Sequence, residues 1–159
     1  MADSVQLLRE QLSRTLDWQE AHLGFDKGIE GIPADRRGHR PAGFTHSAWE
    51  LLEHMRIAQN DLLDFCVNAN YVHARNWPDD YWPIDSAPSA TEWQASIDAF
   101  KADRAALKKL AADVSIDLFA KVPAGKPNQT YLRAILLVIE HNAYHLGQLV
   151  AVRQALTGL

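Results

Sequence analysis

Two histidines stand four residues apart in the stretch EHNAYHLGQ (140–148). The surrounding residues, 131–156, contain no proline and one glycine, and their apolar side chains recur at helical spacing. In a helix, His141 and His145 would lie one turn apart on the same face. That face is the apolar stripe, which comprises Ala134, Val138, His141, His145, Leu149 and Val152.

Imidazoles in such a stripe need partners for both ring nitrogens, because burying an unpartnered polar group is costly. A divalent metal ion meets this need, since it binds one nitrogen while a nearby acceptor takes the proton on the other. Histidines at i and i+4 hold zinc in H-E-x-x-H proteases, but here Asn142 replaces the catalytic glutamate, which argues against that class. The pair therefore consists either of metal ligands or of hydrogen-bonded core histidines.

A third ligand is expected on a facing helix, because metal sites in helix bundles draw their ligands from several helices. His54 lies three residues after Leu51 and four before Ala58, and so flanks the apolar stripe of its segment. Three histidine nitrogens would leave one coordination position open, which is typical of catalytic zinc sites. Cys66 is an alternative ligand, but it lies more than three helical turns from His54 and is expected in the core.

Four amphipathic helices are expected to position these residues, over 4–24, 47–70, 89–112 and 129–156. Ser47 with Glu50, and Ser89 with Glu92, have the spacing of capping boxes, and a glycine follows the last helix. The core-facing residues expected on the first three helices are Val5, Leu8, Leu12, Leu16, Ala21, Leu51, Met55, Ala58, Leu62, Phe65, Cys66, Trp93, Ile97, Phe100, Ala105, Leu107 and Leu110.

This pattern predicts an all-α fold, a four-helix bundle in a single domain over residues 1–159. The connections 25–46 and 71–88 are unusually long, and each could run the length of a 20-residue helix, so crossover connections are possible. The second connection holds four large aromatic residues, which usually pack against other groups. We expect it to cap one end of the bundle, or to form a pocket wall or a dimer contact.

The composition of the chain argues against several classes of function. The chain is 47% hydrophobic and 23% charged, with a net charge of −4, so it offers no basic surface for nucleic acid or an anionic membrane. A single cysteine excludes an internal disulfide. The first residues lack a signal-peptide pattern, and the longest apolar run, 134–139, is too short to cross a bilayer. We expect a cytoplasmic protein that acts on a small molecule.

Two stretches together resemble the DinB/YfiT-like family of metalloenzymes. They are HSAWELLEHMRIAQNDLL (46–63) and HNAYHLGQLVAVRQ (141–154), and RPAGFTHSAW (40–49) and WPDDYW (77–82) are similar to a bacterial branch of the family. The resemblance covers essentially the whole chain. The family pattern, one histidine on the second helix and H-x-x-x-H on the fourth, matches His54, His141 and His145.

The resemblance implies a bundle with non-sequential connectivity, often a homodimer, whose three histidines hold a divalent ion, commonly nickel or zinc. It also implies an enzymatic activity. Characterised relatives include a maleylpyruvate isomerase, and they include S-transferases that use low-molecular-weight thiols. Many members have no assigned substrate.

Four further residues are candidates for catalysis or for supporting the ligands, with solvated surface positions as the alternative. Glu50 and Asp61 lie four before and seven after His54, and either could accept a proton from a ligand imidazole or act as a base. Gln148 lies seven residues after His141, and Tyr144 three residues after it. The histidines expected not to be ligands are His22, His39, His46 and His73.

These observations favour a metal-dependent enzyme that uses a thiol for S-transfer. A metal-dependent hydrolase is an alternative that needs the same ligands. A binding protein with a structural ion is another, and so is a dimeric bundle with hydrogen-bonded histidines. In the transferase hypothesis the metal activates the sulfur of a cofactor, and Cys66 is not the nucleophile.

Overall fold

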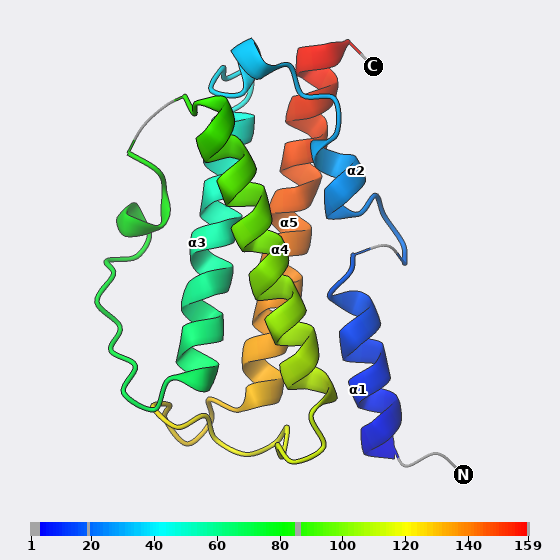
Figure 1. The fold of residues 1–159 in the computed structure, drawn as a ribbon, viewed down its shortest axis with the longest axis vertical. Coiled ribbons are helices and arrows are strands. Elements are labelled where there is room, and N and C mark those ends of the chain that lie inside the picture. The colour runs from blue at the N-terminus through cyan, green and yellow to red at the C-terminus, as the bar shows by residue number, and fades with distance from the viewer. Residues whose placement is uncertain (1–3, 19, 85–86, 159) are drawn as a thin grey trace.

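The computed structural model describes residues 4–18, 20–84 and 87–158, which form a bundle of helices (Figure 1). The long helices are α1 (Ser4–Thr15), α3 (Ala48–Val67), α4 (Ala90–Ala112) and α5 (Tyr131–Thr157). The short elements are α2 (Phe25–Ile29) and the 3-10 turns η1 (Ala34–Arg36) and η2 (Asp79–Tyr81). The described residues form no strand beyond one isolated bridge between Lys121 and Thr130. The predicted all-α fold is confirmed.

Two of the long helices begin at the predicted capping boxes. At the start of α3, the Ser47 hydroxyl accepts a hydrogen bond from the Glu50 backbone N–H, and the Glu50 carboxylate accepts one from the Ser47 N–H. Ser89 and Glu92 make the same two hydrogen bonds before α4. Each pair satisfies two backbone donors that a helix start leaves free, which fixes where the helix begins.

The first predicted helix is wrong in its second half. α1 ends at Thr15, and the chain turns at Trp18, whose φ is 50°. This turn buries the Trp18 side chain in the core, where its indole N–H donates to the Ile139 carbonyl of α5 at 3.2 Å. Ala21 is exposed rather than in the core, and α2 begins at Phe25. The chain therefore leaves the helical conformation after Thr15, because the turn allows the Trp18 indole to be buried in the core.

Most of the predicted apolar stripes form the core, with two further exceptions. Val5 is exposed because it lies in the first turn of α1, at the end of the bundle. Ala105 is exposed because it lies about 140° around α4 from Phe100, which is buried. Cys66 is in the core as expected, and burial raises the pKa of its thiol to about 12.

The chain connects its helices through one long crossover. α1 and α5 run in one direction and α3 and α4 in the other (Figure 1). α3 packs against α4 and α5, whereas α1 packs mainly against α4 and α2 against α5. Because α3 and α4 are parallel, the chain must return along the bundle, and Figure 1 shows residues 68–84 running beside α3 rather than capping an end. The crossover therefore brings the aromatic residues of this segment to the side of the bundle.

The helix α5 carries two of the three histidines. The Thr130 side chain accepts a hydrogen bond from the Arg133 N–H at its start, and Gly158, with φ 73°, ends it in the left-handed conformation that glycine adopts easily. By length and composition alone α5 could cross a membrane. Central helices of soluble proteins pass the same test, and Ala134, Val138 and Leu149 are buried inside the bundle. We interpret α5 as such a core helix.

Candidate metal centre

The three predicted histidines meet between α3 and α5. Nε2 of His54 lies 3.0 Å from Nε2 of His141 and 3.1 Å from Nε2 of His145. One ring nitrogen from each residue lies within 4.8 Å of the other two, so the three form a group that could hold a metal ion. His54 and His145 are buried and His141 is half-buried. The facing helices therefore place these imidazoles together, although 87 residues separate the first two in sequence.

His54 is held by the crossover segment. Its Nδ1 donates to the Tyr81 backbone carbonyl at 2.8 Å, because a carbonyl oxygen can only accept. The Trp82 indole stacks on the His54 ring with centroids 3.9 Å apart and an interplanar angle of 4°. The His46 ring stacks on the other side of Trp82, at 4.0 Å and 10°. One carbonyl and one flat aromatic surface thus fix the orientation of this imidazole.

His145 is held from its own helix. Its Nδ1 lies 2.7 Å from Oε1 of Gln148, and the Gln148 amide N–H₂ donates to the Tyr144 hydroxyl at 3.3 Å. The Tyr144 ring also packs edge-on against His145, at 4.8 Å and 80°. Gln148 is therefore the acceptor for the outer nitrogen of this histidine, whereas Tyr144, which is 64% exposed, lies at the margin of the site.

His141 is held through a buried chain of two amides. The Phe100 carbonyl of α4 can only accept, so the Gln59 amide N–H₂ must face it, at 2.8 Å. This leaves Oε1 of Gln59 to accept from the Asn142 amide at 3.0 Å. Oδ1 of Asn142 then faces Nδ1 of His141 at 3.3 Å. We call Phe100, Gln59 and Asn142 the amide relay; the Gln59 and Asn142 side chains are each 1% exposed.

These contacts decide which ring nitrogen of each histidine carries the proton. All three Nδ1 atoms face an acceptor oxygen, so in the neutral imidazoles the three Nε2 atoms are unprotonated and converge. Unprotonated nitrogens about 3 Å apart repel unless a cation lies between them. Zinc–nitrogen bonds of about 2.0–2.1 Å place two neighbouring ligand nitrogens about 2.8–3.4 Å apart at angles of about 90–110°. The spacing of the His54 nitrogen from those of His141 and His145, and the protonation of all three imidazoles, therefore fit a metal ion.

The electrostatic setting keeps these rings neutral. Burial, together with the neighbouring His141, lowers the pKa of His54 and of His145 to about 4. Burial also lowers the pKa of His141. At neutral pH, lone pairs rather than protons therefore point into the centre, as a metal ligand requires.

The two carboxylates predicted near His54 have different positions. Glu50 is engaged at the start of α3, where its carboxylate binds the Ser47 N–H and the Arg40 guanidinium, and these contacts hold its pKa below the usual range despite burial. Asp61 instead accepts hydrogen bonds from the hydroxyls of Tyr81, at 2.6 Å, and Tyr71, at 3.1 Å. Through Tyr81, Asp61 is linked to the backbone that binds His54.

A half-open cavity leads to the centre. Its volume is about 650 Å³, and both Asp61 and His141 line it. The crossover segment contributes Tyr71, Trp77 and Tyr81 to its wall. Part of this segment therefore forms a pocket wall, which was one of the roles expected for it. A molecule in this cavity would reach the imidazole of His141, and with it the open side of the centre.

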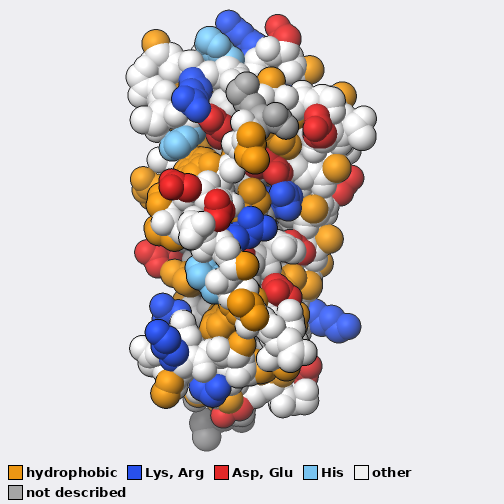
Figure 2. All heavy atoms as spheres, turned by 90° about the vertical axis from the view of Figure 1, so that its left-hand side faces the viewer, with side chains coloured by type: hydrophobic (Ala, Val, Ile, Leu, Met, Phe, Trp, Pro, Cys, Tyr) orange, Lys and Arg blue, Asp and Glu red, His pale blue; other side chains and the backbone are white. Residues whose placement is uncertain are grey.

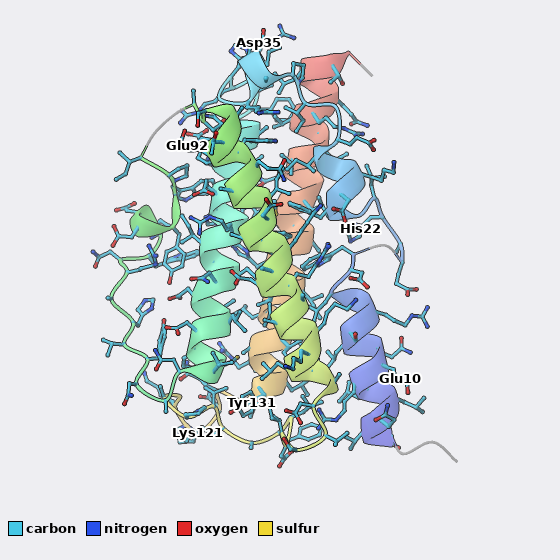
Figure 3. The ribbon with its side chains drawn as sticks, viewed as in Figure 1. Glu10, His22, Asp35, Glu92, Lys121 and Tyr131 are labelled. Carbon is cyan, nitrogen blue, oxygen red and sulfur yellow. The ribbon has the colours of Figure 1, made fainter. Side chains whose placement is uncertain are left out.

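The other histidines lie apart from the cluster or in its surroundings. His22 is exposed beside α2, on the side of the bundle away from the crossover segment (Figure 3). His39 is exposed, and His73 contacts the Tyr71 hydroxyl at the cavity. His46 is linked to the site through its stacking on Trp82.

Sequence reasoning did not identify the amide relay or the Tyr81 carbonyl. The sequence does contain a feature that could have identified Gln59. It lies four residues after Met55 inside an apolar stripe, and a buried amide needs hydrogen-bond partners. No feature of the sequence identifies the Tyr81 carbonyl, because every residue has a backbone carbonyl.

The matching family model is that of the DinB superfamily, over residues 24–149. The chain belongs to the DinB superfamily. The match spans α2 to most of α5 and includes all three histidines. No curated protein and no solved structure matches the chain. Membership in the DinB superfamily and the geometry of the centre agree on a group of histidines that could bind a metal ion.

Proposed function

We propose that this DinB-superfamily protein is a metal-dependent enzyme in which His54, His141 and His145 bind one divalent ion, nickel or zinc. The observation that carries the proposal is the convergence of three unprotonated Nε2 atoms whose Nδ1 atoms all face acceptors. Imidazole ligands suit both metals. When bound, such an ion lowers the pKa of a thiol or water molecule that reaches it.

The proposed reaction is thiol-dependent S-transfer. The thiol loses its proton, its sulfur forms a bond to an electrophilic carbon of the second substrate, and the leaving group departs with the bonding electrons. The cavity beside His141 gives both small molecules access to the centre. The buried Cys66 takes no part, because burial holds its pKa at about 12.

We assign the role of proton acceptor to Asp61. Among the four residues suggested by the sequence, it is the carboxylate that lines the cavity together with His141. Its hydrogen bonds from Tyr71 and Tyr81 keep its oxygens oriented toward this side of α3. Glu50 is unsuited to this role, since the helix start and Arg40 already engage it.

The test supplies nickel- or zinc-loaded protein with glutathione and an aryl chloride, and measures chloride release and thioether formation. We expect turnover that needs both the thiol and the metal, with strong loss in His141→Ala and reduced turnover in Asp61→Asn. Hydrolytic turnover of esters or amides without any thiol would reject the transferase and favour a metal-dependent hydrolase. Stoichiometric metal without either activity would favour a non-catalytic metal-binding protein.

A further inference from the structure

The far end of the cavity carries two positively charged side chains. Lys126, from the connection before α5, and Arg133, in the first turn of α5, both line it. Within residues 4–18, 20–84 and 87–158, neither side chain makes an ion pair or a hydrogen bond. Figure 2 looks onto the crossover side of the molecule, and basic side chains gather near the lower end of this face.

The wall that α5 gives the cavity changes chemistry along its length. Arg133, Leu137 and His141 are spaced by four residues, so they form one row on the helix, and all three line the cavity. Eight residues of helix separate the outer two by about 12 Å along the axis. The row therefore presents a cation at one end, an apolar surface in the middle and the candidate metal centre at the other end.

The opposite walls are largely apolar. α3 contributes Ala58, Leu62 and Phe65, and the crossover segment contributes the Trp77 ring. Such a surface binds a hydrocarbon or aromatic body rather than a compact inorganic ion.

The charges that line the cavity favour a ligand with one negative charge. Lys126 and Arg133 contribute two positive charges, and Asp61 contributes one negative charge, which leaves one positive charge in excess. The guanidinium of Arg133 can bind a carboxylate through two parallel hydrogen bonds. Asp61 accepts hydrogen bonds from two tyrosine hydroxyls near the candidate centre, so the Lys126 and Arg133 side chains remain free to bind the carboxylate of the ligand.

We propose that the cavity binds an organic monocarboxylate with an apolar body. Arg133 and Lys126 bind its carboxylate, its body lies against Leu137 and Phe65, and its other end faces His141. This inference deepens the proposed function, because it gives the chemical class of the substrate that would approach the metal. The carboxylate site itself consists of residues outside the histidine cluster, so it can be tested in metal-free protein.

The experiment measures binding of phenylbutyrate and its uncharged amide, phenylbutanamide, to metal-free protein by titration calorimetry. We expect one phenylbutyrate per chain, and at least about tenfold weaker binding both for the amide and for the Arg133→Gln, Lys126→Gln double variant. Lys109→Gln is the matched control, because Lys109 is an exposed cation in the last turn of α4 and does not line the cavity. Circular dichroism checks that each variant is folded.

Equal affinities for the acid and the amide would overturn the proposal, and so would full affinity in the folded double variant. Inorganic phosphate that binds as tightly as phenylbutyrate would overturn the assigned ligand class. Since the protein contains no metal in this test, a missing carboxylate site would leave the metal proposal standing. Conversely, a protein that binds phenylbutyrate but no metal would refute only the metal-dependent function.

Discussion

His54 and His141 point at the same centre but are supported by different kinds of structure. His54 is supported from the crossover segment, residues 68–84, through one backbone carbonyl and the Trp82 ring. His141 is supported from inside the bundle, through the amide relay that ends on α4. The position of His54 therefore depends on the path of a long connection, and that of His141 on the packing of three helices.

The difference has a consequence for mutation. The relay depends on the buried side chains of Gln59 and Asn142, so a single substitution breaks it and leaves its partners without hydrogen bonds. The Tyr81 carbonyl remains whatever the side chain, so substitution can only shift it. We therefore expect the support of His141 to be more sensitive to mutation than that of His54.

The largest effect is expected when a ligand itself is removed. His54→Ala and His141→Ala should each abolish stoichiometric metal binding, because two imidazoles then remain at the centre. Titration of metal-free protein with zinc, followed by calorimetry, measures this loss. A His22→Ala variant is the control, since His22 lies on the far side of the bundle (Figure 3), and it should bind like the parent. Metal binding with unchanged affinity in either ligand variant would contradict the site.

The next largest effect is expected from breaking the amide relay. Asn142→Leu or Gln59→Leu should weaken zinc binding by about 10–100-fold, the usual range for partners that orient a ligand imidazole. The matched control is Asn60→Leu, because Asn60 is exposed on the same helix as Gln59 and hydrogen-bonds Asp103. Folded relay variants that bind zinc like the parent would show that His141 needs no such support.

A smaller effect is expected from loosening the crossover segment. Tyr81→Phe removes the hydrogen bond to Asp61 but keeps the carbonyl that binds His54. We expect zinc affinity to fall less than in Asn142→Leu, and hydrogen exchange in residues 71–84 to become faster. A larger loss of affinity in Tyr81→Phe than in the relay variants would show that the support of His54 is the more sensitive of the two.

The last effect concerns the stability of metal-free protein at acid pH. The pKa of His145 is about 4 in the fold and about 6.5 in an unfolded chain. Between these values the unfolded chain binds more protons, so the free energy of unfolding decreases as the pH falls from 7 toward 4. His145→Gln should weaken this decrease, as measured by urea unfolding at pH 7 and at pH 5. An identical pH dependence in the two proteins would rule out this contribution.

Helical periodicity explains how much of this site the sequence could predict. The spacing of His141 and His145 within an apolar stripe fixes the face on which both lie, and the flanking of His54 by Leu51 and Ala58 does the same on α3. The capping boxes of Ser47 and Ser89 fixed two helix starts because they depend on local hydrogen bonds alone.

Features that depend on tertiary structure could not be predicted in this way. The carbonyl of Tyr81 reaches His54 because of the path of an irregular segment, and no periodicity describes that path. The turn at Trp18 has a similar cause, since the indole finds its partner, the Ile139 carbonyl, on a helix more than a hundred residues later. A homodimer remains a prediction from the family resemblance.

The metal site is tested most directly by the metal content of the protein, purified without an affinity tag and measured by elemental analysis. We predict one nickel or zinc ion per chain in the parent protein, and none above background in folded His54→Ala. Parent protein without stoichiometric metal, even after incubation with zinc and nickel, would contradict the central claim that the three imidazoles form a metal site.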